Sequence, residues 1–262
     1  MLSISSNSNY FFAFVFLLLS FSLNAQNNAI AAGEQLTYTA AYNMSGILTD
    51  IAQVTMETSN IKTSKITLLR LKCTAATYSK WDNFFKIRDL YESYVSPKTL
   101  TPYLYKRDIN EGNYYKYMKY TFSHKTKTVK SQLKKKNNYE ENKNITINSG
   151  TKDIVSTLYK IRLFDYKNMS VGTNKSLTII FDREEFKGQI TYLGIETITT
   201  AIGKKACYKI AIGSSQTDVL KGKNSNFLWL TADENKIPVY GKFKIPVGNG
   251  ELKIKSATGL KH

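Results

Sequence analysis

The chain of 262 residues is 42% hydrophobic and carries a formal net charge of +17, from 37 Lys and Arg against 20 Asp and Glu. This length is enough for a large core in one domain, because all-β barrels and sandwiches often reach about 200 to 250 residues as a single unit. Only 2 His and 2 Cys occur, which argues against a zinc site, and we expect no metal and no cofactor.

The N-terminal segment has the pattern of a secretory signal peptide. The first 25 residues contain no Asp, Glu, Lys or Arg, and an apolar run from Tyr10 to Phe21 precedes Ala25. This run is shorter than the roughly 18 apolar residues of a membrane-spanning helix. A small residue also stands where a signal peptidase would cleave. We therefore predict a signal peptide at 1–25, with an uncleaved membrane anchor as the alternative, and a single β-rich domain at 26–262.

Alternation with a period of two begins after the predicted signal peptide. It is clear in EQLTYTAAY (34–42), IAQVTMET (51–58) and KITLLRLKCTA (65–75). Such β-branched and aromatic runs, separated by Gly, Asn and Asp, predict antiparallel strands. Similar runs continue to the end of the chain, so we expect about twelve to fourteen strands. The fold class is all-β with one or two short helices: a single curved antiparallel sheet, a partly open β-barrel or a sandwich.

Two cysteines, Cys73 and Cys207, lie in predicted strands that are far apart in the sequence. In an oxidising compartment they could form a disulfide, which would stabilise the fold by restricting the unfolded chain. Two separately buried thiols are the alternative. Sequence spacing does not show whether the two Cα atoms come within the ~7 Å that a bridge requires.

The segment GNYYKYMKYTFSH (112–124) places tyrosines between lysines. On a strand, alternate residues share a face. One face holds the side chains that we expect in the core, with Lys116 near an edge: Tyr114, Met118, Tyr120 and Phe122. The other face holds Tyr115, Tyr117 and Lys119, which we predict to contact a ligand. A tyrosine offers a flat apolar ring to a sugar or acyl chain and a hydroxyl to a polar head group.

The same region is strongly basic. From Lys98 to Lys143 the chain carries 12 Lys or Arg against 4 Asp or Glu. In a cytosolic protein such a cluster would suggest binding to nucleic-acid phosphates. Because we expect export to the periplasm or the cell surface, the expected partners are a lipid, a glycan or an anionic envelope surface. We expect peripheral membrane contact at most and no nucleic acid. The alternative is a solvated hairpin that keeps the protein soluble.

One segment interrupts the strand pattern. TKDIVSTLYKIRLFDY (151–166) has apolar residues at helical spacing, no Gly or Pro, and Thr151 or Asp153 as an N-cap residue. It predicts a helix of about three turns that lies against the sheet.

Five segments of the chain, taken in order, resemble an exported bacterial family of unknown function, family 3108. They are GEQLTY (33–38), SYVSPKTLTPYLY (93–105), DIVSTLYKIR (153–162), TYLGIETITTAIGKKACYKI (191–210) and FLWLTADENKIPVYGKFKIPVG (227–248). The resemblance implies a curved antiparallel sheet and an export signal, with no established reaction or catalytic residues. It also singles out Asp153, Ser156, Tyr159 and Arg162 as a helix face with a binding role. An N-cap with a surface ion pair is the alternative for these residues.

Catalytic motifs are scarce. The chain has no HExxH, CxxC, GxSxG, Walker or GxGxxG motif, and His124 is the only histidine before the last residue. A glycosidase needs only two carboxyl groups at a defined separation. The carboxylates that could serve by composition are Asp182, Glu184, Glu185, Glu196, Asp233 and Glu234. Glu184 and Glu185 would point to opposite faces of a strand.

We therefore expect a non-enzymatic envelope protein that binds an amphiphile, lipid or glycan on its curved sheet. The alternatives are a carboxylate-based hydrolase acting on envelope carbohydrate and a structural partner of an outer-membrane complex.

Overall fold

The computed structural model describes residues 26–44, 47–214, 226–245 and 248–262. The predicted signal peptide at 1–25 lies outside the described residues. Within them, the all-β prediction is confirmed: 14 strands form one antiparallel sheet. The strands are β1 (Gln35–Met44), β2 (Ile47–Lys62), β3 (Thr67–Thr77), β4 (Arg88–Val95), β5 (Pro102–Glu111), β6 (Tyr114–Ser123), β7 (Thr128–Lys135), β8 (Glu140–Thr146), β9 (Asn174–Phe181), β10 (Glu184–Thr200), β11 (Gly203–Ser214), β12 (Asn226–Thr231), β13 (Pro238–Ile245) and β14 (Gly248–Thr258). The helical elements are α2 (Ile154–Ile161) and the 3-10 turns η1 (Ser79–Trp81) and η2 (Tyr166–Asn168).

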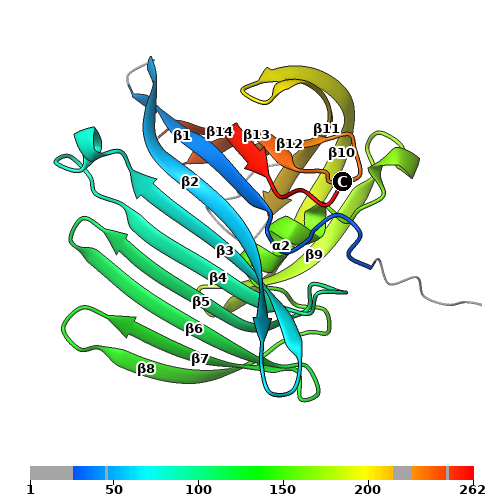
Figure 1. The fold of residues 1–262 in the computed structure, drawn as a ribbon. Helices are drawn as coiled ribbons and strands as arrows, with labels where there is room; N and C mark the ends of the chain where they lie inside the picture. The colour runs from blue at the N-terminus through cyan, green and yellow to red at the C-terminus, as the bar shows by residue number, and fades with distance from the viewer. Residues whose placement is uncertain (1–25, 45–46, 215–225, 246–247) are drawn as a thin grey trace, which may run out of the picture.

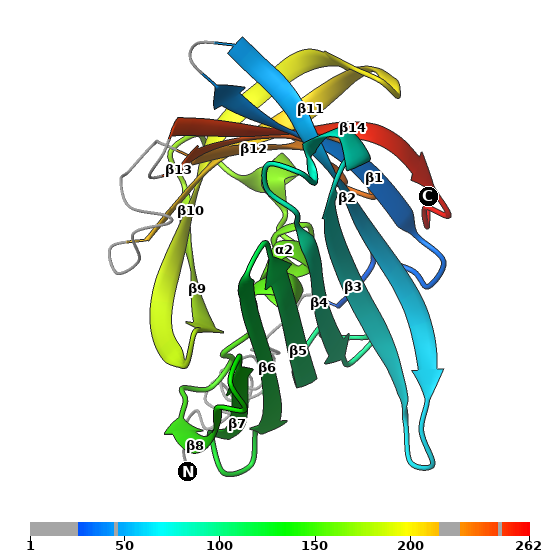
Figure 2. The same ribbon diagram turned by 90° about the vertical axis from the view of Figure 1, so that its left-hand side faces the viewer.

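The strands form two consecutive meanders. β1 to β8 lie side by side in sequence order, β9 to β14 do the same, and β1 pairs with β14 where the meanders meet. β8 and β9 are therefore the two edges of the sheet, which curls without closing into a barrel (Figure 1). The connection between the edges holds α2, which packs on β3, β4 and β9 inside the curl (Figure 2).

The helix begins where the sequence pattern predicts. Asp153 is the N-cap residue, and its side chain accepts a hydrogen bond from the backbone N–H of Ser156. The helix ends at Ile161, after about two turns rather than the predicted three. The apolar spacing that continued beyond Ile161 in the sequence belongs instead to Tyr166 of η2, which is buried against β10 and β11.

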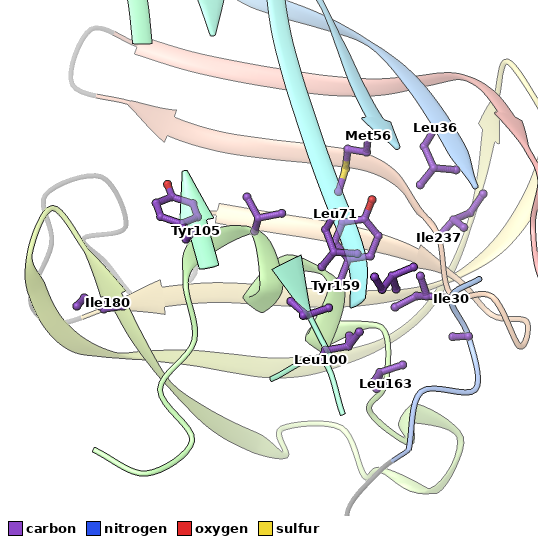
Figure 3. Close-up of a cluster of buried hydrophobic side chains, with 14 of the residues drawn as sticks. Ile30, Leu36, Met56, Leu71, Leu100, Tyr105, Tyr159, Leu163, Ile180 and Ile237 are labelled. Carbon is purple, nitrogen blue, oxygen red and sulfur yellow. The ribbon is translucent and has the colours of Figure 1, made fainter. Parts of the chain in front are cut away.

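The core lies on the inner face of the sheet, around α2. Figure 3 shows Tyr159 of α2 among side chains of β1, β2 and β3. This burial stabilises the strands, because alternate side chains point inward, as in β5 with Tyr105, Arg107 and Ile109. Protein side chains therefore fill the region between α2 and the inner face of the sheet.

Strand β6 tests the predicted face assignment. Met118, Tyr120 and Phe122 are buried as predicted. Tyr114 is not: its side chain is 49% exposed, because it is the first residue of β6 and follows the turn from β5. Lys116 points inward on the core face and pairs with Asp182.

The two cysteines are free thiols, so the disulfide considered from the sequence is not formed. In the strand registers, Cys73 of β3 lies opposite Met56, on the core face. Cys207 of β11 lies on the same face as Lys209, and Lys209 lies opposite Trp229. The strand registers place these two faces on opposite sides of the sheet. A residue's face fixes the direction of its Cβ atom, and thiols on opposite faces cannot meet.

Candidate ligand-binding site

The predicted helix-face residues lie in the core. The Arg162 guanidinium makes a two-pronged ion pair with Glu34, with distances of 2.6 Å from Nη1 to Oε1 and 2.7 Å from Nη2 to Oε2. Both side chains are buried, at 1% and 0% exposed. Although burial opposes it, the bond to Glu34 raises the pKa of Arg162. This pair is internal, whereas the sequence suggested a binding face or a surface pair.

Asp153 and Tyr159 are also closed off from solvent. The Asp153 carboxylate accepts hydrogen bonds from the Ser93 hydroxyl at 2.6 Å and from the Ser156 N–H at 2.8 Å. Burial nevertheless raises the pKa of Asp153. The Tyr159 hydroxyl has no hydrogen-bond partner among the described residues. These buried groups therefore offer no surface to a ligand.

The β9–β10 turn makes a second set of ion pairs, in which the Asp182 side chain stays 45% exposed. The turn residues Asp182 and Arg183 both have positive φ, as a two-residue hairpin turn requires. Asp182 accepts bonds from Arg107 and Lys116, and Arg183 donates to the Ser131 hydroxyl at 2.9 Å. The two cations lower the pKa of Asp182 against the opposing effect of its burial. This candidate catalytic carboxylate therefore joins the β9–β10 turn to β5 and β6 of the other meander.

Three of the remaining candidate carboxylates are engaged in bonds, and Glu184 and Glu234 are exposed. Glu185 bonds to Asn148 and Thr151, Glu196 bonds to Lys209 and Trp229, and Asp233 caps its own turn. Glu184 and Glu185 are successive strand residues and point to opposite faces, as predicted.

The other predicted ligand residues lie together on the outer face. Tyr115, Tyr117 and Lys119 alternate with the buried residues of β6 and are partly exposed. Lys119 helps to line a shallow depression of about 290 Å³ over β6, β7 and β8, together with Lys130 and Gln132. The six predicted ligand residues thus divide into a buried inner group and an outer group, and the sheet separates them.

A larger pocket, of about 590 Å³, lies on the outer face where β13, β14 and β1 adjoin. The tip of the β10–β11 hairpin curls back over these strands (Figure 1). Gly194, at φ +112°, stands at the irregularity in the β10–β11 pairing between Tyr192 and Gly194. The lining residues are Thr39, Asp50, Ile198, Thr199, Thr200, Ala201, Val239, Tyr240, Lys253, Ile254 and Lys255. None of them was predicted from the sequence as a site residue.

Side-chain contacts hold the hairpin beside this pocket. Glu196 of the hairpin accepts hydrogen bonds from Trp229 Nε1 at 2.8 Å and from Lys209 Nζ at 2.7 Å. These two bonds lower the pKa of Glu196. Trp229 in turn packs on Tyr240 of the pocket lining, with ring centroids 4.9 Å apart. The Trp229 bond therefore ties the hairpin to β12, next to the part of the pocket wall that Tyr240 forms.

Two lysines and two carboxylates, Asp50 and Glu251, lie in or beside the mouth of the pocket. Lys253 and Lys255 supply two ammonium groups, and Asp50 supplies one carboxylate. Lys253 lies 3.3 Å from Glu251. Lys255 is exposed. Against the effect of burial, bonds from Tyr240 and Lys253 lower the pKa of Glu251. The arrangement combines an apolar interior with cations at one rim, and this volume lies within the range of small-molecule sites.

Other kinds of site were not found in the described part of the chain. No group of three or more His, Cys, Asp or Glu side chains there could hold a metal ion. Among the described residues, no helix has the length and apolarity needed to cross a membrane.

One solved structure supports the fold. A β-barrel-like protein of Brucella abortus, a DUF1849 domain of unknown function, superposes with a TM-score of 0.55 at 6% identity and covers 88% of this chain and 98% of its own. A Bacteroides fragilis protein described as having a YmcC-like fold covers 87% of this chain and 96% of its own, at 10% identity and a TM-score of 0.37. No curated protein matches the sequence. Residues 37–255 match the family described as protein of unknown function (DUF3108), and the chain belongs to that family.

Proposed function

We propose that this chain is an exported, non-enzymatic protein of the cell envelope that binds a single-chain amphiphile with an anionic head group. The observation that carries the proposal is the pocket of about 590 Å³ between the β10–β11 hairpin and the outer face of β13, β14 and β1. Ile198, Ala201 and the aliphatic stems of Lys253 and Lys255 offer apolar surface to an acyl chain. The ammonium groups of these two lysines would pair with the head group, and Lys253 would then share it with Glu251.

The pocket favours an amphiphile over a polar glycan. A glycan site typically stacks a sugar on a flat and accessible aromatic ring. Here Tyr240 packs against Trp229 and donates its hydroxyl to Glu251, so both its ring and its hydroxyl have partners within the protein. The apolar side chains of the lining are then the surface left for a ligand.

The described lining of this pocket does not favour a hydrolase. Among those residues Asp50 is the only carboxylate, and a glycosidase uses a pair. Export is supported by the apolar N-terminal segment that precedes Gln26.

Titration of the purified protein with a fluorescent fatty-acid analogue tests the proposal. We expect saturable binding at one site, and K253Q/K255Q should weaken it about tenfold by removing both cations at the pocket mouth. K242Q/K244Q is the matched control, because it removes the same charge from the adjacent strand β13 and Lys242 also pairs with Glu251. Absence of saturable binding, or equal weakening by both double variants, would overturn the proposal.

A further inference from the structure

The antiparallel topology gathers three connections at one end of the sheet, beside the end of β1 and the start of β2. The β3–β4, β5–β6 and β7–β8 turns lie at this end, since each odd-numbered strand runs toward it and the next strand runs away. They follow one another along the left side of Figure 1. We call this the turn end.

Exposed apolar side chains concentrate at the turn end. Phe84 is 81% exposed, Ile47 is 70% exposed and Phe85 is 52% exposed. Of the ten large apolar side chains that are exposed among the described residues, six belong to the start of β2, to these turns or to the first residues after them: Ile47, Leu48, Phe84, Phe85, Tyr114 and Tyr139. Single exposed apolar residues need no explanation, but a concentration of them marks an interaction surface.

Lysines flank these apolar side chains. Lys80 and Lys86 bracket the β3–β4 connection, whose sequence between them is WDNFF. Lys134, Lys135 and Lys136 precede Tyr139 at the β7–β8 turn, and Lys135 Nζ lies 5.4 Å from the centre of the Tyr139 ring. Lysine is depleted from the cores of protein–protein interfaces. Aromatic residues between lysines are instead typical of segments that lie in the interface of an anionic membrane.

We propose that the turn end docks on an anionic lipid bilayer, with Phe84 and Phe85 inserted among the acyl chains and the lysines on the head groups. The β3–β4 connection adjoins the pocket, because Trp81 Nε1 donates a hydrogen bond of 2.9 Å to the carbonyl of Asp50, which lines it. Docking would therefore bring the pocket close to the lipid surface. The docking inference does not depend on what the pocket binds.

Fluorescence quenching by vesicles of phosphatidylglycerol and phosphatidylcholine with brominated acyl chains tests the inference. The chain has 2 Trp, so the variants W229F and W81F each keep one reporter. We expect quenching of Trp81 in W229F and little quenching of the buried Trp229 in W81F. Vesicles of phosphatidylcholine alone should bind much more weakly, and binding should fall with salt because exposed charges are screened.

Two matched variants locate the docking surface. F84S/F85S should weaken vesicle binding by about tenfold or more, given the apolar area removed. The control I66S/Y103S also removes two exposed apolar side chains, but from the opposite end of the sheet. Circular dichroism would verify that each variant is folded. Unchanged vesicle binding by F84S/F85S, equal loss in I66S/Y103S, or equal quenching of both tryptophans would overturn the inference. Retained binding of the soluble fatty-acid analogue would show that the proposed function stands independently.

Discussion

The inner and outer faces of the sheet use charged side chains in different ways. On the inner face, Arg162 and Glu34 are buried and paired with each other, and Arg107 pairs with Asp182. On the outer face, Lys255 stands at the pocket mouth and is exposed. A buried charge without a partner is costly, so inner charges must be satisfied within the protein. The comparison indicates that the inner charges help to fix the fold, whereas the pocket mouth keeps a charge in contact with solvent.

The largest effect that separates the two faces is expected at Arg162. Arg162→Met should lower the free energy of unfolding by about 3 to 5 kcal/mol, because Glu34 would remain buried without its cation. Urea denaturation measures the change. The double variant R162M/E34L should recover part of the loss, since it leaves no unpaired charge. A stable R162M protein would contradict the view that this pair is sealed in the core.

A smaller effect is expected from the two faces of β6. Tyr120→Ala should cost about 3 kcal/mol of stability through the cavity it leaves. It also removes the hydroxyl that accepts the Arg183 N–H at 2.8 Å. The control Y115A/Y117A on the outer face should cost less than about 1 kcal/mol in the same thermal or urea unfolding experiment. Greater destabilisation by the control would invert the face assignment.

The pH dependence of stability should also reflect the titration of a carboxyl group on the inner face. Burial, with Glu111 nearby, raises the pKa of Asp89 to about 6 in the folded protein. The folded state then holds this proton more tightly than the unfolded chain, so the Asp89 contribution to stability falls as pH rises from about 4 to about 6. Unfolding midpoints measured across this range should decline less steeply in D89N than in the parent protein. Identical slopes would show that Asp89 titrates normally.

The smallest stability effect should come from the hairpin that covers the pocket. Gly194→Val forces a β-branched residue to a φ of +112° and should cost about 1 to 2 kcal/mol. Because the bend displaces Ile198 relative to Tyr240, we expect weaker binding of the fatty-acid analogue by a protein that remains folded. Gly203→Val serves as the control, since Gly203 also has a positive φ but is not part of the pocket lining. Equal affinity for the fatty-acid analogue in both variants would show that the bend does not shape the pocket.

Local sequence patterns predicted much of the fold. Period-two alternation indicated the strands, and the spacing after Asp153 indicated α2 together with its cap. The error at Tyr114 has a simple cause: alternation assigns a face, but a side chain at the end of a strand has no neighbours to cover it. The length of the helix was overestimated, because apolar spacing does not show where tertiary contacts end it.

Neither the buried ion pair nor the pocket could be predicted, because both depend on contacts between distant segments. Glu34 and Arg162 are 128 residues apart, and the sequence offers no sign that they pair. In the same way, Ile198 and Tyr240 line one pocket because β10 bends and its hairpin reaches over β13 and β14. Gly194 within a long strand pattern was the available signal, since an isolated strand glycine suggests a bulge. The signal indicates a bend but not which surface the bend covers.

The most direct measurement of the central claim is quenching of Trp229 by a soluble brominated fatty acid, in the W81F variant and without vesicles. Trp229 packs 4.9 Å from Tyr240, measured between ring centroids, and Tyr240 lines the pocket. A fatty acid bound beneath the hairpin should therefore quench this tryptophan in a saturable manner, and the unbrominated fatty acid should reverse the effect by competition. Saturable binding that leaves Trp229 fluorescence unchanged would place the ligand elsewhere and contradict the account.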